Sequence, residues 1–202
     1  MLRKHFVLLG LLLSAVLLII ATQVYPGGNW ADPQAPGFDW TKNFFSNLFQ
    51  PKAMNGADSN SRYWADAGMV LMACSFAVFF VGYADRLPDM KARRVVKWSA
   101  VVAMVTMMLV VTPMHDLMVA LSSTFFLLCF FYITVFILKS RLLLFKVLCV
   151  AYLGLSYYTL YLYGMGKIEN LAIMQKVTVA SQILLLLGLQ YFTIKEDLKP
   201  KA

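Results

Sequence analysis

Six long runs of apolar residues, separated by short polar connectors, make up most of the chain. Each run holds about twenty residues, the length that a helix needs to cross about 30 Å of hydrocarbon. Helices are expected because an open strand edge would leave backbone groups without hydrogen bonds in lipid. The predicted spans are Phe6–Val24, Trp64–Tyr83, Val95–Thr112, Leu117–Leu138, Leu142–Tyr163 and Leu171–Thr193.

A cleaved signal peptide is the alternative for the first run. The apolar core of such a peptide holds about 7–15 residues and precedes a small-residue cleavage site. Here the run that follows Arg3 and Lys4 is longer, and no clear A-x-A sequence comes after it. We therefore expect a retained helix.

The composition agrees with a membrane protein. Hydrophobic residues make up 60% of the chain and charged residues only 14%, against roughly 25% charged in a soluble domain. The net charge is +8, but its basic residues sit in the short connectors and form no soluble basic face, so no nucleic-acid partner is expected. The sequence predicts an all-α fold, one six-helix transmembrane domain over residues 1–202.

Basic residues alternate from connector to connector. They are frequent at the amino terminus, in 84–97, in 139–146 and in the tail, whereas the turn around Pro113 has none. Because positively charged connectors stay in the cytoplasm, we expect both termini to be cytoplasmic. The first loop (25–63), the Pro113–Asp116 turn and the Gly164–Asn170 connector are then extracytoplasmic.

The first loop is the only long polar segment. Within it, apolar residues recur at helical spacing on one face of Trp40–Gln50, with Asp39 as a candidate N-cap and Pro51 as the stop. This pattern predicts a short amphipathic helix in the membrane interface. Two interpretations stay open: a structural lid that packs on the helix ends, or a cover for a lipid headgroup or small polar ligand.

His115 and Asp116 are the candidates for chemistry. They open the fourth span, and histidine is the side chain that titrates near neutral pH. Asp116 also suits the positive end of a helix, which would make it a structural cap. Ser122 and Ser123 lie two turns further along, about 10 Å away, which disfavours a Ser–His hydrolase. We predict no cofactor and no metal site, although a metal held by His115 with nearby carboxylates stays an alternative.

The topology gathers polar residues from five segments at the extracytoplasmic side. We expect them to form one outward-facing pocket that binds a lipid or small amphiphile. The alternatives are an enzyme acting on a lipid or envelope precursor through His115 and Asp116, and an accessory subunit that packs against a membrane-protein partner. The candidate site residues are Asp32, Asp39, Asn43, Asn47, His115, Asp116, Tyr158, Glu169, Gln175 and Lys176.

Other classes are disfavoured. The chain has no HExxH, GxSxG or phosphate-loop sequence, and no ionisable residue near the centre of a span, where ion pumps usually need one. Gln175, Thr178 and Gln182 share one face of the sixth span. They are expected either to bond neighbouring helices or to line a cavity.

The first loop, YPGG…D…PGFDW…NFFSNL…NG, together with TPMHD at the start of the fourth span, resembles the bacterial domain-of-unknown-function 998 family. That family is similar to the DRAM/Sfk-type six-span membrane proteins. Its members more often have an Asp-Leu pair where this chain has Asn47-Leu48. The resemblance implies a six-helix bundle in a bacterial inner membrane and implies no established reaction.

The charge distribution makes a testable prediction about sidedness. Single cysteines placed in the first loop and in the Pro113–Asp116 turn should both react with a membrane-impermeant maleimide added outside intact cells. A cysteine in the basic 84–97 connector should react only after permeabilisation. Labelling of the first loop and the Pro113 turn from opposite sides would rule out a shared pocket.

Overall fold

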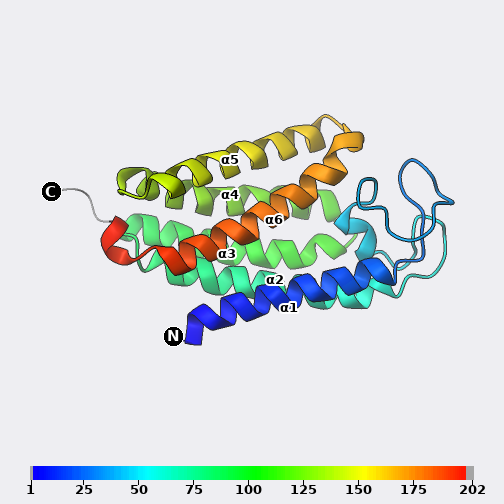
Figure 1. The fold of residues 1–202 in the computed structure, drawn as a ribbon, viewed down its shortest axis with the longest axis horizontal. Coiled ribbons are helices and arrows are strands. Elements are labelled where there is room, and N and C mark those ends of the chain that lie inside the picture. Colours follow the sequence, from blue (N-terminus) through cyan, green and yellow to red (C-terminus); the bar gives the residue numbers. More distant parts are fainter. Residues whose placement is uncertain (1, 199–202) are drawn as a thin grey trace.

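The computed structural model describes residues 2–198, which form a bundle of six long helices (Figure 1). Three short 3-10 helices complete the secondary structure, and no strand occurs within 2–198. The long helices are α1 (Leu2–Gln23), α2 (Ser61–Ala84), α3 (Met90–Met108), α4 (His115–Lys139), α5 (Leu143–Gly164) and α6 (Ile168–Phe192), and the short ones are η1 (Phe45–Phe49), η2 (Leu109–Val111) and η3 (Lys195–Leu198).

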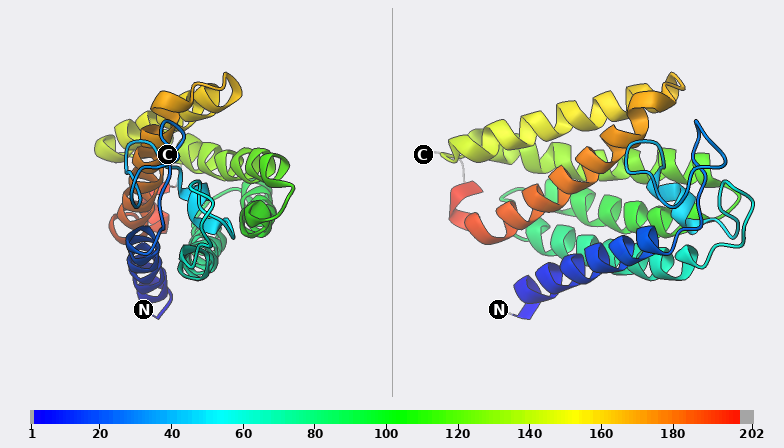
Figure 2. Two further views of the ribbon diagram at one scale, coloured as in Figure 1. Left: turned by 90° about the vertical axis from the view of Figure 1, so that its right-hand side faces the viewer. Right: turned by 45° about the vertical axis from the view of Figure 1, so that its right-hand side comes forward.

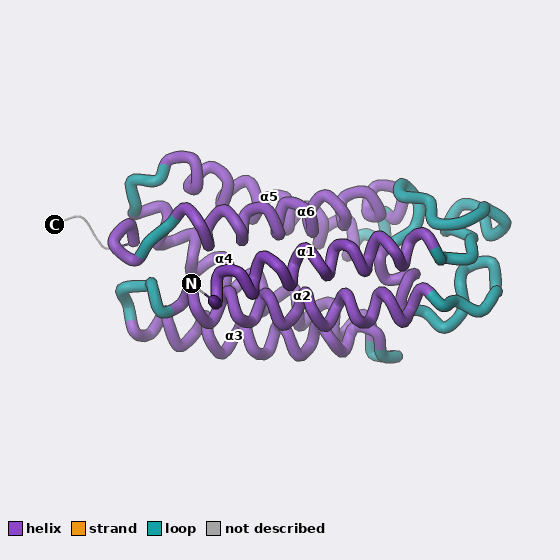
Figure 3. The backbone as a smooth tube through the Cα atoms, turned by 60° about the horizontal axis from the view of Figure 1, so that its bottom comes forward, coloured by secondary structure: helices purple, strands orange, loops and turns teal. Residues whose placement is uncertain are grey.

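All six long helices are long and apolar enough to cross a membrane. The predicted all-α fold and the six predicted spans are therefore confirmed, with ends shifted by a few residues. The chain is thus a multi-pass membrane protein. The first loop and the α3–α4 and α5–α6 turns lie at one end of the bundle, which we call the loop end (Figure 3). The two ends of the described chain lie at the opposite end, the terminal end (Figure 1).

Helix α2 is the centre of the packing. It contacts α1, α3, α6 and η1, and one face of it carries the fully buried rings of Phe76, Phe79 and Phe80. The Phe80 ring meets those of Phe126 and Phe130 from α4 edge-on, at centroid distances of 5.2 and 5.6 Å. Such edge-to-face pairs add to the free energy gained from burial. Aromatic packing therefore joins α2 to α4.

Small residues bring α1 and α2 close together. Ser14 of α1 donates a hydrogen bond of 2.7 Å to the carbonyl oxygen of Gly68 on α2. A Cβ atom on Gly68 would lie only 3.2 Å from the Ser14 carbonyl oxygen. Close helix contacts through small residues are typical of membrane bundles, where lipid is as apolar as the protein core.

Helix α6 crosses the bundle diagonally. Figures 1 and 2 show its first turns beside the end of α5 at the loop end and its last turns beside α2 at the terminal end. At the terminal end the Tyr83 hydroxyl lies 3.0 Å from Thr193 Oγ1. Arg86, just after α2, donates to the carbonyl oxygens of Thr193 (2.9 Å) and Leu189 (3.3 Å). These are carbonyls that the end of a helix leaves without intrahelical partners.

This arrangement predicts that Arg86 stabilises the fold. Replacing it with alanine removes both of these hydrogen bonds in a partly buried position, although Thr193 Oγ1 still donates to the Leu189 carbonyl at 2.7 Å. We expect Arg86→Ala to lower the free energy of unfolding by about 2 kcal/mol, which corresponds to a drop in melting temperature of about 4–8 °C for a chain of this size. Arg94→Ala, at an exposed position of α3, is the matched control and should leave the melting temperature in detergent unchanged. Equal melting temperatures for both variants would contradict this role.

Candidate functional site

Two glycines organise the first loop. Gly27 and Gly28 have φ angles of 141° and 82°, which L side chains rarely adopt. A Cβ atom on Gly28 would lie 2.5 Å from the backbone nitrogen of Asn55. The freed space lets Gly28 N–H donate to the Ala35 carbonyl (2.7 Å) and the Gly28 carbonyl accept from the Asn43 side chain (2.8 Å). Asn55 N–H donates in turn to the Gly27 carbonyl (3.2 Å), so the start, middle and end of the loop are tied together.

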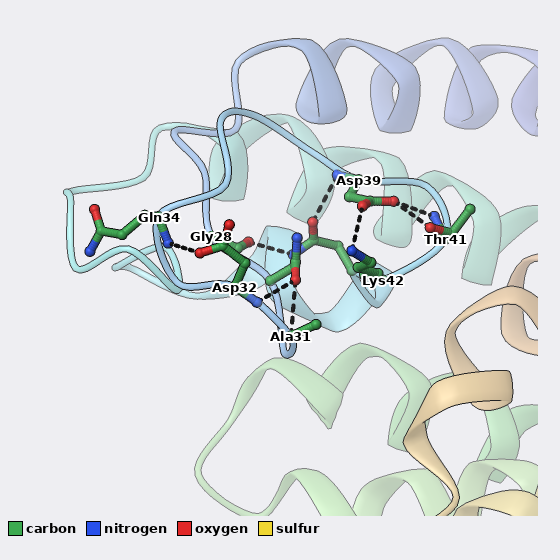
Figure 4. A network of polar contacts seen from close by, with 9 residues as sticks. Gly28, Ala31, Asp32, Gln34, Asp39, Thr41 and Lys42 are labelled. Atoms are coloured by element: carbon green, nitrogen blue, oxygen red, sulfur yellow. Dashed lines mark hydrogen bonds and ion pairs between the residues drawn. The ribbon is translucent and has the colours of Figure 1, made fainter.

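Tyr25 and Asp39 add two further ties. The Tyr25 hydroxyl accepts a hydrogen bond from the backbone N–H of Met54 (3.1 Å), and burial raises the pKa of this tyrosine. The Asp39 carboxylate accepts from the hydroxyl (2.6 Å) and the N–H (2.8 Å) of Thr41. The bond from the Thr41 hydroxyl is the main reason that the pKa of Asp39 lies below its ordinary value. Figure 4 shows the contacts between Asp39 and Thr41, and Asp32 accepting from the backbone N–H of Gln34 in a neighbouring turn.

The predicted helix over Trp40–Gln50 is shorter than expected. The structure has turns at 40–42 and only the 3-10 helix η1 at Phe45–Phe49. The reason lies in the side chains, because Asp39 bonds to Thr41 in a separate turn, and Asn47 Oδ1 accepts from the N–H of Phe44 (2.7 Å) and so caps η1, which begins only at Phe45. Short polar side chains that satisfy nearby backbone groups compete in this way with a regular helix.

The loop is clamped onto α6 by two polar side chains. Gln175 Oε1 accepts the backbone N–H of Phe45 at 2.9 Å. Lys176 Nζ donates to the carbonyl oxygens of Asn43 and Ala172. Its ammonium group also lies over the rings of Phe38 (5.6 Å) and Phe45 (5.5 Å), an arrangement in which ring and cation attract each other. This pair of residues is called the α6 clamp below.

Under the clamped loop lies a cavity of about 450 Å³. Its wall is mainly apolar, which is typical of sites for small molecules. Phe44, Phe45 and Phe49 of the loop cover it, and methionines of α2 and α3 form part of its side. The polar residues of this upper compartment are Ser46, His115, Ser123, Thr159, Tyr163 and Gln175.

A second compartment of about 220 Å³ continues from the first toward the middle of the bundle. The two share six wall residues, so they adjoin between α2, α3, α4, α5 and α6, and together they are called the elongated cavity below. The deeper compartment is lined by Phe76 and Phe126 of the aromatic core and by polar residues of α5 and α6. The shared wall residues are Met72, Met107, Ser123, Thr159, Leu160 and Val179.

His115 lies where the cavity meets the loop end. Its Nδ1 atom is 3.0 Å from Asp116 Oδ1, and the same oxygen accepts a 2.6 Å bond from the Tyr163 hydroxyl. The side chain of His115 is 31% exposed and that of Asp116 is 87% exposed, and only His115 lines the cavity. Asp116 lies in the first turn of α4, where the helix dipole favours a carboxylate as expected, but Met114 holds the N-cap position and the Asp116 carboxylate accepts a bond from Tyr163. It joins α4 to α5.

The structure brings some of the predicted site residues together and separates others. His115 and Gln175 line the cavity. Asn43 and Asn47 bond within the loop, and Lys176 holds the loop in place without lining the cavity.

The remaining predicted residues lie outside the cavity wall. Asp32 and Asp39 stabilise turns of the loop. Tyr158 and Glu169 are exposed, and neither lines either compartment. Residue type alone could not show that His115 and Gln175 line the cavity and that these residues do not, because this depends on the direction in which each side chain points.

Several wall residues were not among the predicted site residues. Tyr152, Ser156 and Thr159 recur at helical spacing on α5, and Thr178 and Gln182 do so on α6. This helical spacing of polar residues on two consecutive spans is the sequence signal that could have predicted them. The Thr159 and Thr178 hydroxyls lie 2.8 Å apart, and the Tyr152 hydroxyl donates to Gln182 Oε1 at 3.3 Å. The polar face of α6 that carries Thr178 and Gln182 therefore both bonds a neighbouring helix and lines a cavity, the two roles considered for it from the sequence.

Across residues 2–198, no three His, Cys, Asp or Glu side chains are grouped so that they could hold a metal ion. Comparisons of the chain with protein-family models, curated proteins and solved structures found no match. The resemblance to the domain-of-unknown-function 998 family stays a prediction from the first loop and the Pro113–Asp116 turn.

The α6 clamp predicts a specific effect on the loop. Replacing Lys176 with methionine keeps the length of the side chain but removes its bonds to the Asn43 and Ala172 carbonyls. We expect loop opening to become easier by about 1–2 kcal/mol, so that cleavage within 38–47 by a protease specific for aromatic residues speeds up about five- to thirtyfold. Lys167→Met, at an exposed residue of the α5–α6 turn, should cleave at the wild-type rate. Equal rates for both variants would show that Lys176 does not hold the loop.

Proposed function

We propose that the protein binds one lipid or small amphiphile in the elongated cavity, with the first loop as its cover. The observation that carries the proposal is the pair of adjoining, mainly apolar compartments that follow one another from the loop end toward the middle of a membrane-spanning bundle. The upper compartment, at about 450 Å³, lies within the range of about 300–1,000 Å³ that is common for ligand sites. An alkyl chain that enters from the bilayer is already in an apolar medium, so its gain in free energy there comes from van der Waals contacts with the cavity wall.

The polar head of the ligand would lie at the loop end. Ser46, His115 and Tyr163 place hydroxyl and imidazole groups at that end of the cavity. Sites of this kind usually combine an apolar wall with a few polar groups that fix orientation. The phenylalanines of the loop then cover the first part of the chain, and the α6 clamp keeps that cover in place.

The charge distribution supports an orientation for this site. With the basic connectors in the cytoplasm, both termini are cytoplasmic and the loop end faces outward, in the inner membrane of a bacterium. An amphiphile could then enter from the outer leaflet. The loop residues Trp40 and Phe45, whose rings are 6.3 Å apart, would lie near the headgroup region, where aromatic side chains are frequent.

One observation favours a second function, an enzyme acting on a lipid-like substrate. The hydrogen bond between His115 Nδ1 and Asp116 Oδ1 would fix the ring and leave Nε2 as the remaining nitrogen for proton transfer. Lipid extracts incubated with wild-type protein and with His115→Gln should then differ in product when compared by mass spectrometry. Identical extracts would contradict the enzyme and leave ligand binding as the proposed function.

Filling the cavity tests the proposed binding. Val179 lines both compartments, so Val179→Trp should occupy the space that an alkyl chain would take. We expect the affinity for a fluorescent single-chain fatty acid to fall about tenfold or more, and lipid retained in native mass spectra from mild detergent to disappear. Val177→Trp makes the same change on an exposed face of α6 and should bind as the wild type does. Unchanged binding by Val179→Trp would contradict the proposal.

A further inference from the structure

The deeper compartment contains more polar residues than an alkyl chain requires. At 1.5 Å per residue, Tyr152 lies about 16 Å further along α5 than Tyr163 at the mouth of the cavity. At this depth the wall still includes Ser122, Ser123 and Gln182. Polar groups inside a membrane protein are costly unless they are hydrogen-bonded, so each of them needs a partner.

Hydrogen bonds between helices account for only part of this polarity. Gln182 uses its Oε1 atom to accept from Tyr152, and Ser122 donates to the Val119 carbonyl of its own helix at 3.1 Å. Within the described chain, Gln182 makes no hydrogen bond through its amide nitrogen and Ser123 makes none through its hydroxyl, and both residues are half-buried. Both residues line the deeper compartment. The cavity therefore offers these two polar groups that its own wall does not satisfy, in addition to the Ser156 hydroxyl, which is buried in the same wall without a partner.

The chemistry of these groups narrows the choice of partner. A side-chain amide has one donating and one accepting end, so whichever end faces Tyr152, the other stays open. The Ser123 hydroxyl also donates and accepts. A hydroxyl group on the ligand can bond to both, because it too has one donor and two acceptor positions. A plain alkyl chain that fills the compartment would give neither group a partner.

We propose that the preferred ligand is an amphiphile whose chain carries a hydroxyl group part-way along its length, and that Gln182 and Ser123 bind this hydroxyl. The inference rests on the proposed function, because it names the class of ligand for the same cavity. The head of the ligand lies at the loop end near His115, the hydroxyl lies in the deeper compartment, and the apolar segment between them passes Leu160 and Val179.

A positional series of monohydroxystearic acids, with stearic acid as the reference, tests the inference. Each acid displaces a fluorescent fatty acid from the full-length protein in detergent. We expect an acid with a mid-chain hydroxyl to bind about five- to tenfold more tightly than stearic acid, as one additional buried hydrogen bond would give. An acid whose hydroxyl lies beside the carboxyl group should gain nothing, because that hydroxyl stays at the loop end.

Three variants identify the groups responsible. Gln182→Leu should abolish the preference for the mid-chain hydroxyl while still binding stearic acid. Ser123→Ala removes no hydrogen bond between helices and should reduce the preference without affecting folding. Gln23→Leu, the same chemical change as Gln182→Leu at an exposed residue of α1, should keep the full preference.

The possible failures are distinguishable. If wild-type protein binds stearic acid and every hydroxylated acid equally, or if Gln182→Leu and Ser123→Ala both retain the preference, this inference is wrong and the proposed function stands. If no acid displaces the probe from wild-type protein, and the probe itself binds equally to Val179→Trp, the proposed function fails and the inference fails with it.

Discussion

Polar groups near both ends of α6 need hydrogen-bond partners within the protein. The position of α6, and with it the rest of the site, depends on which residues provide them. At the terminal end, Arg86 and Tyr83 hold the last turn of α6 against α2. At the loop end, Gln175 and Lys176 bond to the backbone of the first loop. Lipid offers no hydrogen bonds that could replace these contacts. Helix α6 is therefore fixed in a diagonal position across the bundle (Figure 1).

The elongated cavity lies beside the diagonally placed helix α6. Polar pairs such as Thr159–Thr178 hold α5 to α6, while the aromatic packing of Phe80 with Phe126 holds α2 to α4. Between these two sets of contacts the helices enclose one cavity in two compartments. Dense packing is the normal state of a protein interior, so space of this size beneath a fixed cover is most simply understood as space for a ligand.

The first loop is an integral part of this site. Its turns are tied together by Gly28, Asn43 and Tyr25, so it reaches α6 as a preformed unit. A preformed cover loses little conformational entropy when a ligand binds beneath it. The α6 clamp is then the natural place at which the cover would separate from the bundle, because it consists of a few polar contacts rather than a large apolar surface.

The six spans were predictable from the sequence because hydrophobic length reports directly on a crossing of the bilayer, and each predicted span corresponds to a helix. The candidate site was predictable only in part. His115 and Gln175 line the cavity, whereas Tyr158 and Glu169, equally polar and at the same end of the bundle, are exposed. The position of a residue within a predicted span indicates its depth in the membrane. Whether its side chain faces the cavity or the outside depends on how the helices pack, and only the tertiary structure decided this. The same holds for Trp40–Gln50, where local bonds of Asp39 and Asn47 replaced the predicted amphipathic helix.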